Sequence, residues 1–312
     1  MVGKNATAYD IIGDVHGHAV KLVRLLAQLG YRELNGAWRH PDRQAIFVGD
    51  LIDRGPAQVE TVRIVRAMVN TGSARCIMGN HEFNAVAWRT PDPAHPGEYL
   101  RPHAKPSNRA QHAAFLAEVE GTPLHEEIVD WFRTLPMYIE EPHIRVVHAC
   151  WHQPSIDWLR AHCRTDGTLT PELYEEGSRK GTAAFSAIET VCKGLEVGLP
   201  GDISFRDKDG KERHEARIRW WDPDLETFRQ AAIGPDELLE RIPDVPFPAN
   251  RRPAPYQGPP VFFGHYWFTG QPRLLGTSAA CVDYSIGRGG PIVAYRWSGE
   301  QTLNAANFVS VS

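Results

Sequence analysis

Cysteine is scarce in this sequence. Its 312 residues contain five cysteines, an odd number, at positions 76, 150, 163, 192 and 281, and no two of them have the CxxC spacing. Small secreted domains that depend on disulfide bonds carry cysteines at much higher density. The pattern therefore favours free thiols in a reducing compartment over a disulfide framework.

An excess of basic residues is also lacking. The formal net charge is −4, and the isoelectric point lies near 6.4. Nonspecific binding to nucleic acids needs a positively charged surface that neutralises phosphates. The charge balance argues against a nucleic-acid partner.

Long hydrophobic runs are missing as well. The first ten residues, MVGKNATAYD, have no apolar segment of the signal-peptide kind, and no stretch reaches the length needed to cross a bilayer. We therefore expect a cytoplasmic protein with no membrane partner. A chain of this length can form one large α/β domain or two smaller ones, and we predict a single domain over 1–312.

What the sequence does contain is a set of five short polar signatures. They are GDVHG at 13–17, GDLIDRG at 49–55, GNHE at 79–82, VVHA at 146–149 and FFGH at 262–265. Each follows or closes an apolar run that predicts a buried strand, namely Tyr9–Ile12, Ala45–Val48, Cys76–Met78, Ile144–Val147 and Val261–Phe263. Because open α/β sheets bind ligands beyond the carboxyl ends of their strands, we expect one functional site at these ends.

Six residues in these signatures carry side chains that bind metal ions: Asp14, His16, Asp50, Asn80, His148 and His265. Carboxylate and amide oxygens combined with imidazole nitrogens suit manganese, iron or zinc better than a metal that prefers thiolates. Asp50 is the natural bridge, with Asp14 and His16 on one side and the other three residues on the other. Two ions about 4 Å apart can clamp the attacking and leaving oxygens of a displacement and acidify a bridging water.

Each signature taken alone also has a structural interpretation. A lone GDVHG could be a strand followed by a tight turn, with glycines that only permit positive φ. A lone histidine after an apolar strand, such as His148, is often a satisfied core residue. The ordered set of five signatures is what favours the metal site.

The ordered set resembles the metallophosphoesterase (calcineurin-like) superfamily. More narrowly, it resembles the phosphoprotein-phosphatase branch, which includes bacterial serine/threonine phosphatases and symmetrical dinucleoside-tetraphosphate hydrolases. The resemblance implies an α/β fold, a two-sheet β sandwich with helices on both outer faces and the site at one edge. It also implies two divalent metal ions on the six residues, with manganese expected and iron or zinc as alternatives. His81 would be the general acid, Asp53 its orienting carboxylate and Arg54 a phosphate contact.

The side chains of these three residues support the same roles. An imidazolium that protonates a leaving alkoxide contributes about 10² to 10⁴ in rate, and a carboxylate partner fixes the ring and raises the pKa of histidine. Arginine presents a planar fork that matches phosphate oxygens. Alternatively, Asp53 and Arg54 form a structural ion pair or an ordinary turn.

Helical periodicity and turn residues predict the elements between the signatures. Helices are expected near 19–29 and 57–70, each followed by a glycine, Gly30 and Gly72. Further helices are expected near 109–119 and 123–134, after a proline-rich loop at 91–106. Ala279–Ile286 and Ile292–Trp297 are predicted to form a closing pair of strands.

Residues 151–258 are predicted to be an insertion or cap that shapes specificity. Helices are expected near 171–177 and 181–193, followed by a hairpin of Ile203–Phe205, a turn at Asp207–Gly210 and a strand at Ala216–Trp221. Alternation would place Arg217, Arg219 and Trp221 on one face of that strand. They form either a solvated edge with an aromatic anchor or a positive, aromatic lip over the metal site. Arg217, Arg219 and Arg229 are candidates for a second phosphate-binding arginine.

These observations predict a metal-dependent phosphatase that hydrolyses phosphomonoesters with metal-bound hydroxide. The preferred substrate is a phosphorylated protein, as for a serine/threonine phosphoprotein phosphatase. The alternative is a symmetrical dinucleoside-polyphosphate hydrolase, since VFFGHYW and Gly287–Gly290 look more like those enzymes, whereas GDVHG and GDLIDRG look more like the bacterial protein phosphatases. A non-catalytic binding scaffold is the third hypothesis, although a scaffold has no physical need for intact ligands and an intact Asp53–His81 pair.

Overall fold

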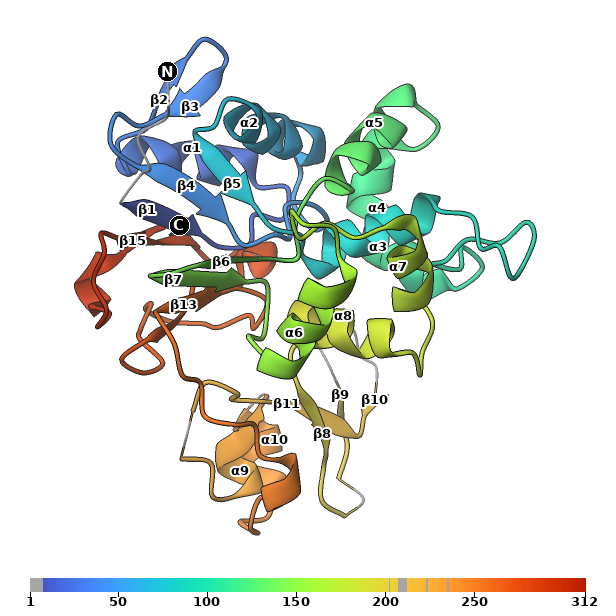
Figure 1. Ribbon diagram of the computed structural model, residues 1–312, viewed down its shortest axis with the longest axis vertical. Helices are drawn as coiled ribbons and strands as arrows, with labels where there is room; N and C mark the ends of the chain where they lie inside the picture. Colours follow the sequence, from blue (N-terminus) through green and yellow to red (C-terminus); the bar gives the residue numbers. More distant parts are fainter. Residues whose placement is uncertain (1–7, 202, 207–211, 223, 235) are drawn as a thin grey trace.

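Two stacked sheets form the centre of the molecule (Figure 1). The computed structural model describes residues 8–201, 203–206, 212–222, 224–234 and 236–312. The first sheet has the order β16-β15-β1-β4-β5, with bounds Phe308–Val311, Ile292–Trp297, Tyr9–Ile12, Gln44–Phe47 and Ala74–Cys76. The second has the order β14-β13-β7-β6, with bounds Ala279–Cys281, Val261–Phe263, Ile144–Val147 and Tyr138–Glu141. The five strands predicted ahead of the signatures are confirmed to within two residues.

Side-chain alternation along these strands produces two separate cores. Ile11 of β1 and Ile46 of β4 meet Val146 of β7 and Phe262 of β13 in the layer between the sheets. The neighbouring residues, such as Phe47, point the opposite way, into the core shared with the helices. The strands are therefore buried on both faces, as the near-continuous apolar runs indicate.

Helices cover the outer faces of the sandwich. The structure contains α1 (Ala19–Gln28), α2 (Gln58–Asn70), α3 (Asn80–Arg89), α4 (Pro106–Val119), α5 (Pro123–Phe132), α6 (Gln153–His162), α7 (Pro171–Gly177), α8 (Ala183–Lys193), α9 (Phe228–Ala231) and α10 (Asp236–Arg241). Helices α1 and α2 pack on the first sheet. On the other side, Ile156 of α6 and Val191 of α8 share a core with Val147 of β7. All six helices predicted from periodicity are present, and residues 91–105 form the predicted loop.

The predicted closing pair of strands is wrong. β14 lies parallel to β13 in the second sheet, whereas β15 runs antiparallel to β1 and β16 in the first. Ala280 and Tyr295 both face the layer between the sheets, but from opposite sides. The segment between the two strands, which includes a 3-10 turn at Ile286–Arg288, therefore connects one sheet to the other.

The predicted hairpin in the 151–258 region is also wrong in its pairing. β9 (Phe205–Arg206) pairs with β10 (Glu212–Arg213), and the predicted turn at 207–210 lies outside the described residues. β11 (Glu215–Ile218) pairs instead with β8 (Glu196–Gly198) and β12 (Ala232–Ile233). This small sheet and α9 and α10 enclose a third core, which lies at the bottom of Figure 1. A further hairpin joins β2 (Arg32–Leu34) to β3 (Ala37–Arg39).

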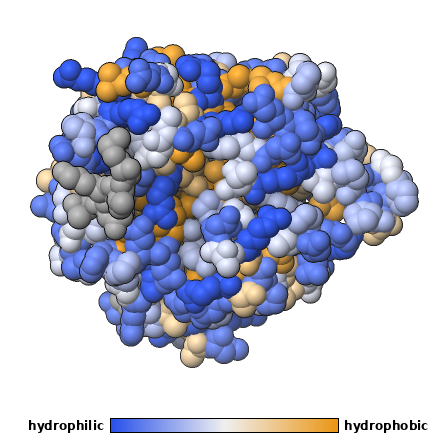
Figure 2. Space-filling view, turned by 45° about the horizontal axis from the view of Figure 1, so that its top comes forward, coloured by the Kyte–Doolittle hydropathy of each residue, from blue (hydrophilic) through white to orange (hydrophobic). Residues whose placement is uncertain are grey.

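The surface carries few large apolar side chains. Among the described residues, the exposed ones are Val20, Leu34 and Val245. On the face shown in Figure 2, hydrophobic residues appear in small groups between polar ones. No helix within the described ranges has the length and apolar character needed to span a membrane.

Candidate metal centre

The carboxyl ends of strands from both sheets converge on one buried cluster. Asp14, Asp50 and Asn80 follow β1, β4 and β5, and His148 and His265 follow β7 and β13. Two contacts join these strand ends, the first within the second sheet and the other between the two sheets. The Gly264 N–H donates to the His148 carbonyl at 2.8 Å, and the His265 N–H lies 3.3 Å from both carboxylate oxygens of Asp14. The predicted convergence of five strand ends is therefore present.

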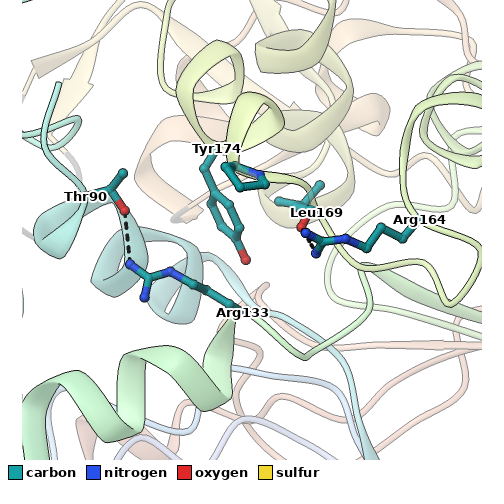
Figure 3. A pocket seen from close by; sticks show the side chains of 6 residues that line it. Thr90, Arg133, Arg164, Leu169 and Tyr174 are labelled. Carbon is teal, nitrogen blue, oxygen red and sulfur yellow. Dashed lines mark hydrogen bonds between the residues drawn. The ribbon is translucent and has the colours of Figure 1, made fainter. Parts of the chain in front are cut away.

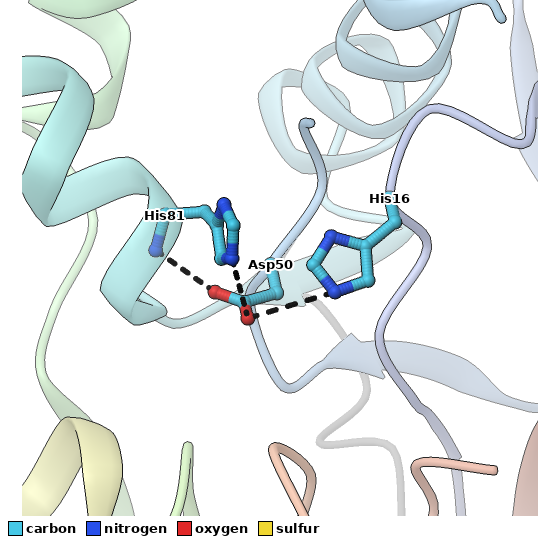
Figure 4. A group of neighbouring side chains, drawn as sticks. All are labelled: His16, Asp50 and His81. Atoms are coloured by element: carbon cyan, nitrogen blue, oxygen red, sulfur yellow. Dashed lines mark hydrogen bonds and ion pairs between the residues drawn. The ribbon is translucent and has the colours of Figure 1, made fainter. Parts of the chain in front are cut away.

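Asp50 lies at the centre of the cluster. Its Oδ2 is 3.8 Å from His16 Nε2 and 3.8 Å from His81 Nε2, the arrangement drawn in Figure 4. The same oxygen is 3.3 Å from His148 Nε2. Among the described residues, two groups of side chains are placed to hold an ion, His16–Asp50–His81 and Asp50–His148–His265, with donor atoms within 4.8 Å of one another. Asp50 belongs to both groups, which is the position of a bridging carboxylate.

The histidine tautomers fit metal binding. His16 Nδ1 donates to the Ile52 carbonyl at 2.8 Å, and His148 Nδ1 donates to the Val48 carbonyl at 2.7 Å. Because a carbonyl only accepts, these contacts assign the hydrogen to Nδ1 and leave the Nε2 lone pair facing the carboxylates. His16 Nε2 is buried and forms no hydrogen bond. It also lies 3.8 Å from Asp14 Oδ2. Two donors that each lie about 2.1 Å from one ion are about 3–4 Å apart, so an ion bound here would satisfy this nitrogen.

The titratable groups of the cluster have strongly shifted pKa values. Burial, with Asp283 and Asp50 nearby, raises the pKa of Asp14. Burial and the neighbouring His81 lower the pKa of His16 to about 3, so its imidazole is neutral, the form that binds metals. Burial lowers the pKa of His148, but the Asp50 carboxylate outweighs it and raises that pKa to about 10. A cation belongs among these acidic groups, and a divalent ion can replace the histidine proton.

The backbone of the cluster adopts conformations that are unfavourable for residues with side chains. Eight non-glycine residues in the described ranges have positive φ, and five of them are predicted site residues: His16 (49°), Asp50 (51°), Asp53 (69°), Arg54 (81°) and His265 (73°). Gly264 packs against Asp14 so closely that a Cβ there would lie 2.1 Å from its Oδ1. Such conformations cost roughly 1–3 kcal/mol each and cluster at functional sites.

His81 is held by Asp53, as the sequence predicts. Its Nδ1 donates to Asp53 Oδ2 at 2.5 Å, and its Nε2 faces the cluster. Burial raises the pKa of Asp53, yet His112 and His81 together hold that pKa well below its usual range. The pair therefore consists of an ionised carboxylate that is hydrogen-bonded to the imidazole ring.

Two supporting residues were not assigned from the sequence. His112 of α4 donates through Nδ1 to the Asp53 carboxylate, at 3.0 Å to Oδ1. The sequence feature that could have identified His112 is its position on the same helical face as Phe115 and Val119. Glu82 accepts backbone N–H groups of Asp50 and Leu51, both at 2.8 Å, and of Gly79 at 2.9 Å. It ties the loop at Asp50 to the start of α3.

Arg54 contacts a residue that the sequence did not single out. Its guanidinium carbon lies 5.7 Å from the indole centre of Trp267, and that indole is 5.4 Å from the His16 ring. Arg54 is partly buried. Its planar cation is thus placed at the edge of the cluster, where a phosphate oxygen can be bound.

Trp221 does not take the exposed position that the proposed lip of Arg217, Arg219 and Trp221 requires. β11 ends at Ile218, and the chain then turns inward, so that Trp220 Nε1 donates to the Ala149 carbonyl and Trp221 is only 8% exposed. Both indoles pack on Phe263, at 5.0 and 5.1 Å between ring centres. The free energy gained by burying the two indoles decides the course of the chain here, so the alternation expected for a strand does not continue beyond Ile218. Arg229 is engaged elsewhere, since its guanidinium donates two hydrogen bonds to the Ile242 carbonyl.

A cavity of about 320 Å³ lies apart from this cluster (Figure 3). Its lining residues are Thr90, Arg133, Arg164, Leu169, Pro171 and Tyr174. The Tyr174 hydroxyl points between the two arginines. Arg133 is paired with Asp130, and Arg164 donates to the Leu169 carbonyl at 2.8 Å. None of the predicted site residues lines this cavity.

Comparison with known proteins gives a family and several relatives of the same name, two of which are described here. Residues 9–181 match the calcineurin-like phosphoesterase family. The asymmetrical bis(5'-nucleosyl)-tetraphosphatase PrpE of Halalkalibacterium halodurans is 49% identical over 74 residues, which are 23% of this chain and 30% of that protein. The protein of the same name from Bacillus subtilis is 30% identical over 196 residues, 60% of this chain and 78% of that protein. The chain thus spans less than a third of the first relative and most of the second.

Among solved structures, a protein serine/threonine phosphatase from Saccharomyces cerevisiae, with similarity to human phosphatase PP5, has a TM-score of 0.50. It is 13% identical, and the alignment covers 98% of this chain and 79% of that chain. At this identity the likeness shows the fold alone. It confirms the layered α/β sandwich that the family resemblance implies.

Proposed function

The chain belongs to the calcineurin-like phosphoesterase family, a family of metal-dependent phosphoric ester hydrolases, and within it we propose a two-metal hydrolase of dinucleoside tetraphosphates. The observation that carries the proposal is the buried Asp50 carboxylate, shared by two groups of metal-binding side chains. The substrate is proposed from the relatives, both of which are named as tetraphosphatases.

The six predicted ligands would hold the two ions. Asp14, His16 and Asp50 would bind one ion, and Asp50, Asn80, His148 and His265 the other, with manganese as the proposed metal. When bound, the ions supply positive charge and Lewis acidity at the phosphorus under attack. His81 Nε2 also lies within reach of an ion, but its Nδ1 is bound to the Asp53 carboxylate, so we assign the residue to the substrate rather than to the metal.

The remaining residues act on the substrate. Arg54 binds oxygens of the phosphate under attack through its planar fork. His81 gives the proton on Nε2 to the leaving oxygen, while Asp53 stabilises the imidazolium through Nδ1. His112 keeps the Asp53 carboxylate in place from the opposite side of the pair. Glu82 fixes the backbone that presents Asp50.

The phosphoprotein substrate that the motifs favoured is the second candidate. Its support is the GDVHG and GDLIDRG pattern, because the likeness to the yeast phosphatase carries no information on substrate. The motifs also suggested symmetrical cleavage, whereas the relatives are named asymmetrical. We propose asymmetrical cleavage of the tetraphosphate for this chain.

One experiment distinguishes these possibilities. The manganese-loaded protein is assayed with diadenosine tetraphosphate, phosphoserine and phosphothreonine peptides and an aryl phosphate, and nucleotide products are separated by ion exchange. We expect the highest kcat/KM for the tetraphosphate, with AMP and ATP as products. ADP as the sole product would establish symmetrical cleavage. Faster turnover of the phosphopeptides, or an intact tetraphosphate, would contradict the proposal.

A further inference from the structure

Arg54 is accompanied by a second arginine on the same indole. The guanidinium carbon of Arg288 lies 5.5 Å from the ring centre of Trp267, and that of Arg54 lies 5.7 Å from it. Arg54 is partly buried, whereas Arg288 is exposed. The two cations therefore lie around one side chain, with Arg54 nearer the interior and Arg288 at the surface.

The indole is held in place by the metal-centre loops. The Trp267 backbone N–H donates to Asp283 Oδ2 at 2.7 Å, and the Ser285 N–H donates to Asp283 Oδ1 at 3.0 Å. Asp283 is buried. It thus joins the loop after His265 to the loop that carries Arg288. Trp267 itself has a positive φ of 55°, a conformation that indole-bearing residues rarely adopt.

Gly287 sets how closely the second loop approaches. A Cβ at this position would lie 2.8 Å from Trp267 Cη2, 3.1 Å from Arg54 Cγ and 3.3 Å from His16 Cδ2. The backbone next to Arg288 is therefore packed directly against the site. On the other side, Lys21 Nζ of α1 donates to the Gly290 carbonyl at 2.9 Å. The loop is anchored at both ends, and the base of the Arg288 side chain is fixed beside the centre.

Two guanidinium groups around one indole repel each other, and contact with the ring offsets only part of this cost. An anion bound by both relieves the repulsion. A phosphomonoester offers one phosphate group, which Arg54 would already bind beside the two ions in the proposed function. A phosphoanhydride chain offers further charged phosphates next to the first, which an exposed arginine at the rim can bind.

We propose that Arg288, held with Arg54 on the indole of Trp267, binds a phosphate of the substrate beyond the one under attack and so selects phosphoanhydride chains over isolated phosphomonoesters. This inference rests on the proposed function for the identity of the substrate. It also supplies the second phosphate-binding arginine, for which the sequence offered only Arg217, Arg219 and Arg229.

The test compares Arg288→Gln with Arg32→Gln. Arg32 is an exposed arginine on β2, so its variant has the same change of charge and shape away from the centre. We expect Arg288→Gln to lower the ratio of kcat/KM for diadenosine tetraphosphate to that for an aryl phosphate roughly tenfold, through KM, because one charge-assisted bond is lost. Arg288→Lys should recover part of the ratio, since it keeps the charge but loses the fork. Arg32→Gln should match the wild type.

A second measurement separates this inference from the proposed function. The inhibition of aryl phosphate hydrolysis is compared for methylenediphosphonate and methylphosphonate at fixed free manganese. Arg288→Gln should weaken the diphosphonate roughly tenfold and the monophosphonate little. If the wild type does not cleave the tetraphosphate but this difference is found, the proposed function fails and the phosphate subsite stands. If the wild type cleaves it and Arg288→Gln behaves like Arg32→Gln in both assays, the subsite is overturned and the function stands.

Discussion

At the scale of single residues, variants of the Asp53–His81 pair distinguish a role in proton transfer from a role in metal binding. His81 Nε2 faces the centre and its Nδ1 is bound to Asp53. We expect His81→Ala to depress kcat strongly for alkyl phosphates, by about 10² or more, and much less for an aryl phosphate, whose leaving group needs less protonation. Asp53→Asn should show the same pattern in milder form. Steady-state rates and metal content are measured together. Equal losses on both substrates, or loss of metal, would count against an acid.

His112 gives a matched pair of variants at the same scale. His112→Ala removes the N–H that the Asp53 carboxylate accepts at 3.0 Å, and a hydrogen bond to a charged group is worth about 1.5–3 kcal/mol. We expect kcat for an alkyl phosphate to fall roughly tenfold or more, with a smaller change for an aryl phosphate. His112→Asn keeps a donor near the position of Nδ1 and should recover most of the rate. A purely structural role would give equal losses on both substrates and no recovery.

The site residues differ in how far the sequence could predict them. Asp50, His81 and the other motif residues follow strands directly, so strand prediction alone brings them together. His112 acts from a helix with no motif of its own. Trp267 lies two residues beyond His265, but its contact with Arg288 depends on the path of the loop that connects β14 of the second sheet to β15 of the first. Contacts between two such loops cannot be inferred from local patterns.

At the scale of elements, the Trp220–Trp221 turn supports the strand that presents His265. Both indoles pack on Phe263, the last residue of β13, and Trp221 also contacts Tyr266 at 5.2 Å. Phe228 is a buried aromatic residue of similar kind, but it packs on Phe247 in the separate third core. Substitutions of Trp221 and Phe228 therefore disturb two different hydrophobic cores.

The two positions give a prediction about support of the metal centre. Truncating a buried aromatic residue to alanine costs about 3–5 kcal/mol. Trp221→Ala should lower both the melting temperature and the manganese content, because it removes packing beneath His265. Phe228→Ala should lower stability as well, yet keep the metal content and the kcat for an aryl phosphate. Thermal unfolding, elemental analysis and rates check this. Full metal content in Trp221→Ala would show that the turn does not support the centre.

Element prediction succeeded where an apolar pattern is long or flanked by clear turn residues. α1 and α2 have amphipathic stripes and end two residues before Gly30 and Gly72, and β1, β7 and β13 were predicted with their observed bounds. It failed for the strand pairing of β11, β14 and β15. Which strands pair with a short strand depends on the burial of side chains outside it, such as Trp220. The sequence of the short strand alone does not determine the pairing.

At the scale of the whole molecule, the centre depends on the stacking of two sheets. Residues from Asp14 to His265 meet only because the carboxyl ends of parallel strands from both sheets lie at the same edge. The described residues between Val197 and Phe247 contribute a third core beside this sandwich. We propose that this unit is an insertion within a single phosphoesterase domain and that it shapes access to the centre without supplying ligands.

The most direct test of the account is the number of metal ions that the centre holds. Wild-type protein and Asp50→Asn are loaded with manganese, desalted and analysed for bound metal, and the turnover of diadenosine tetraphosphate is measured on the same samples. Because Asp50 is shared by both groups of ligands, the account predicts two ions per chain in the wild type, and one or none in Asp50→Asn with loss of turnover. Two tightly held ions in Asp50→Asn, with unchanged turnover, would contradict it.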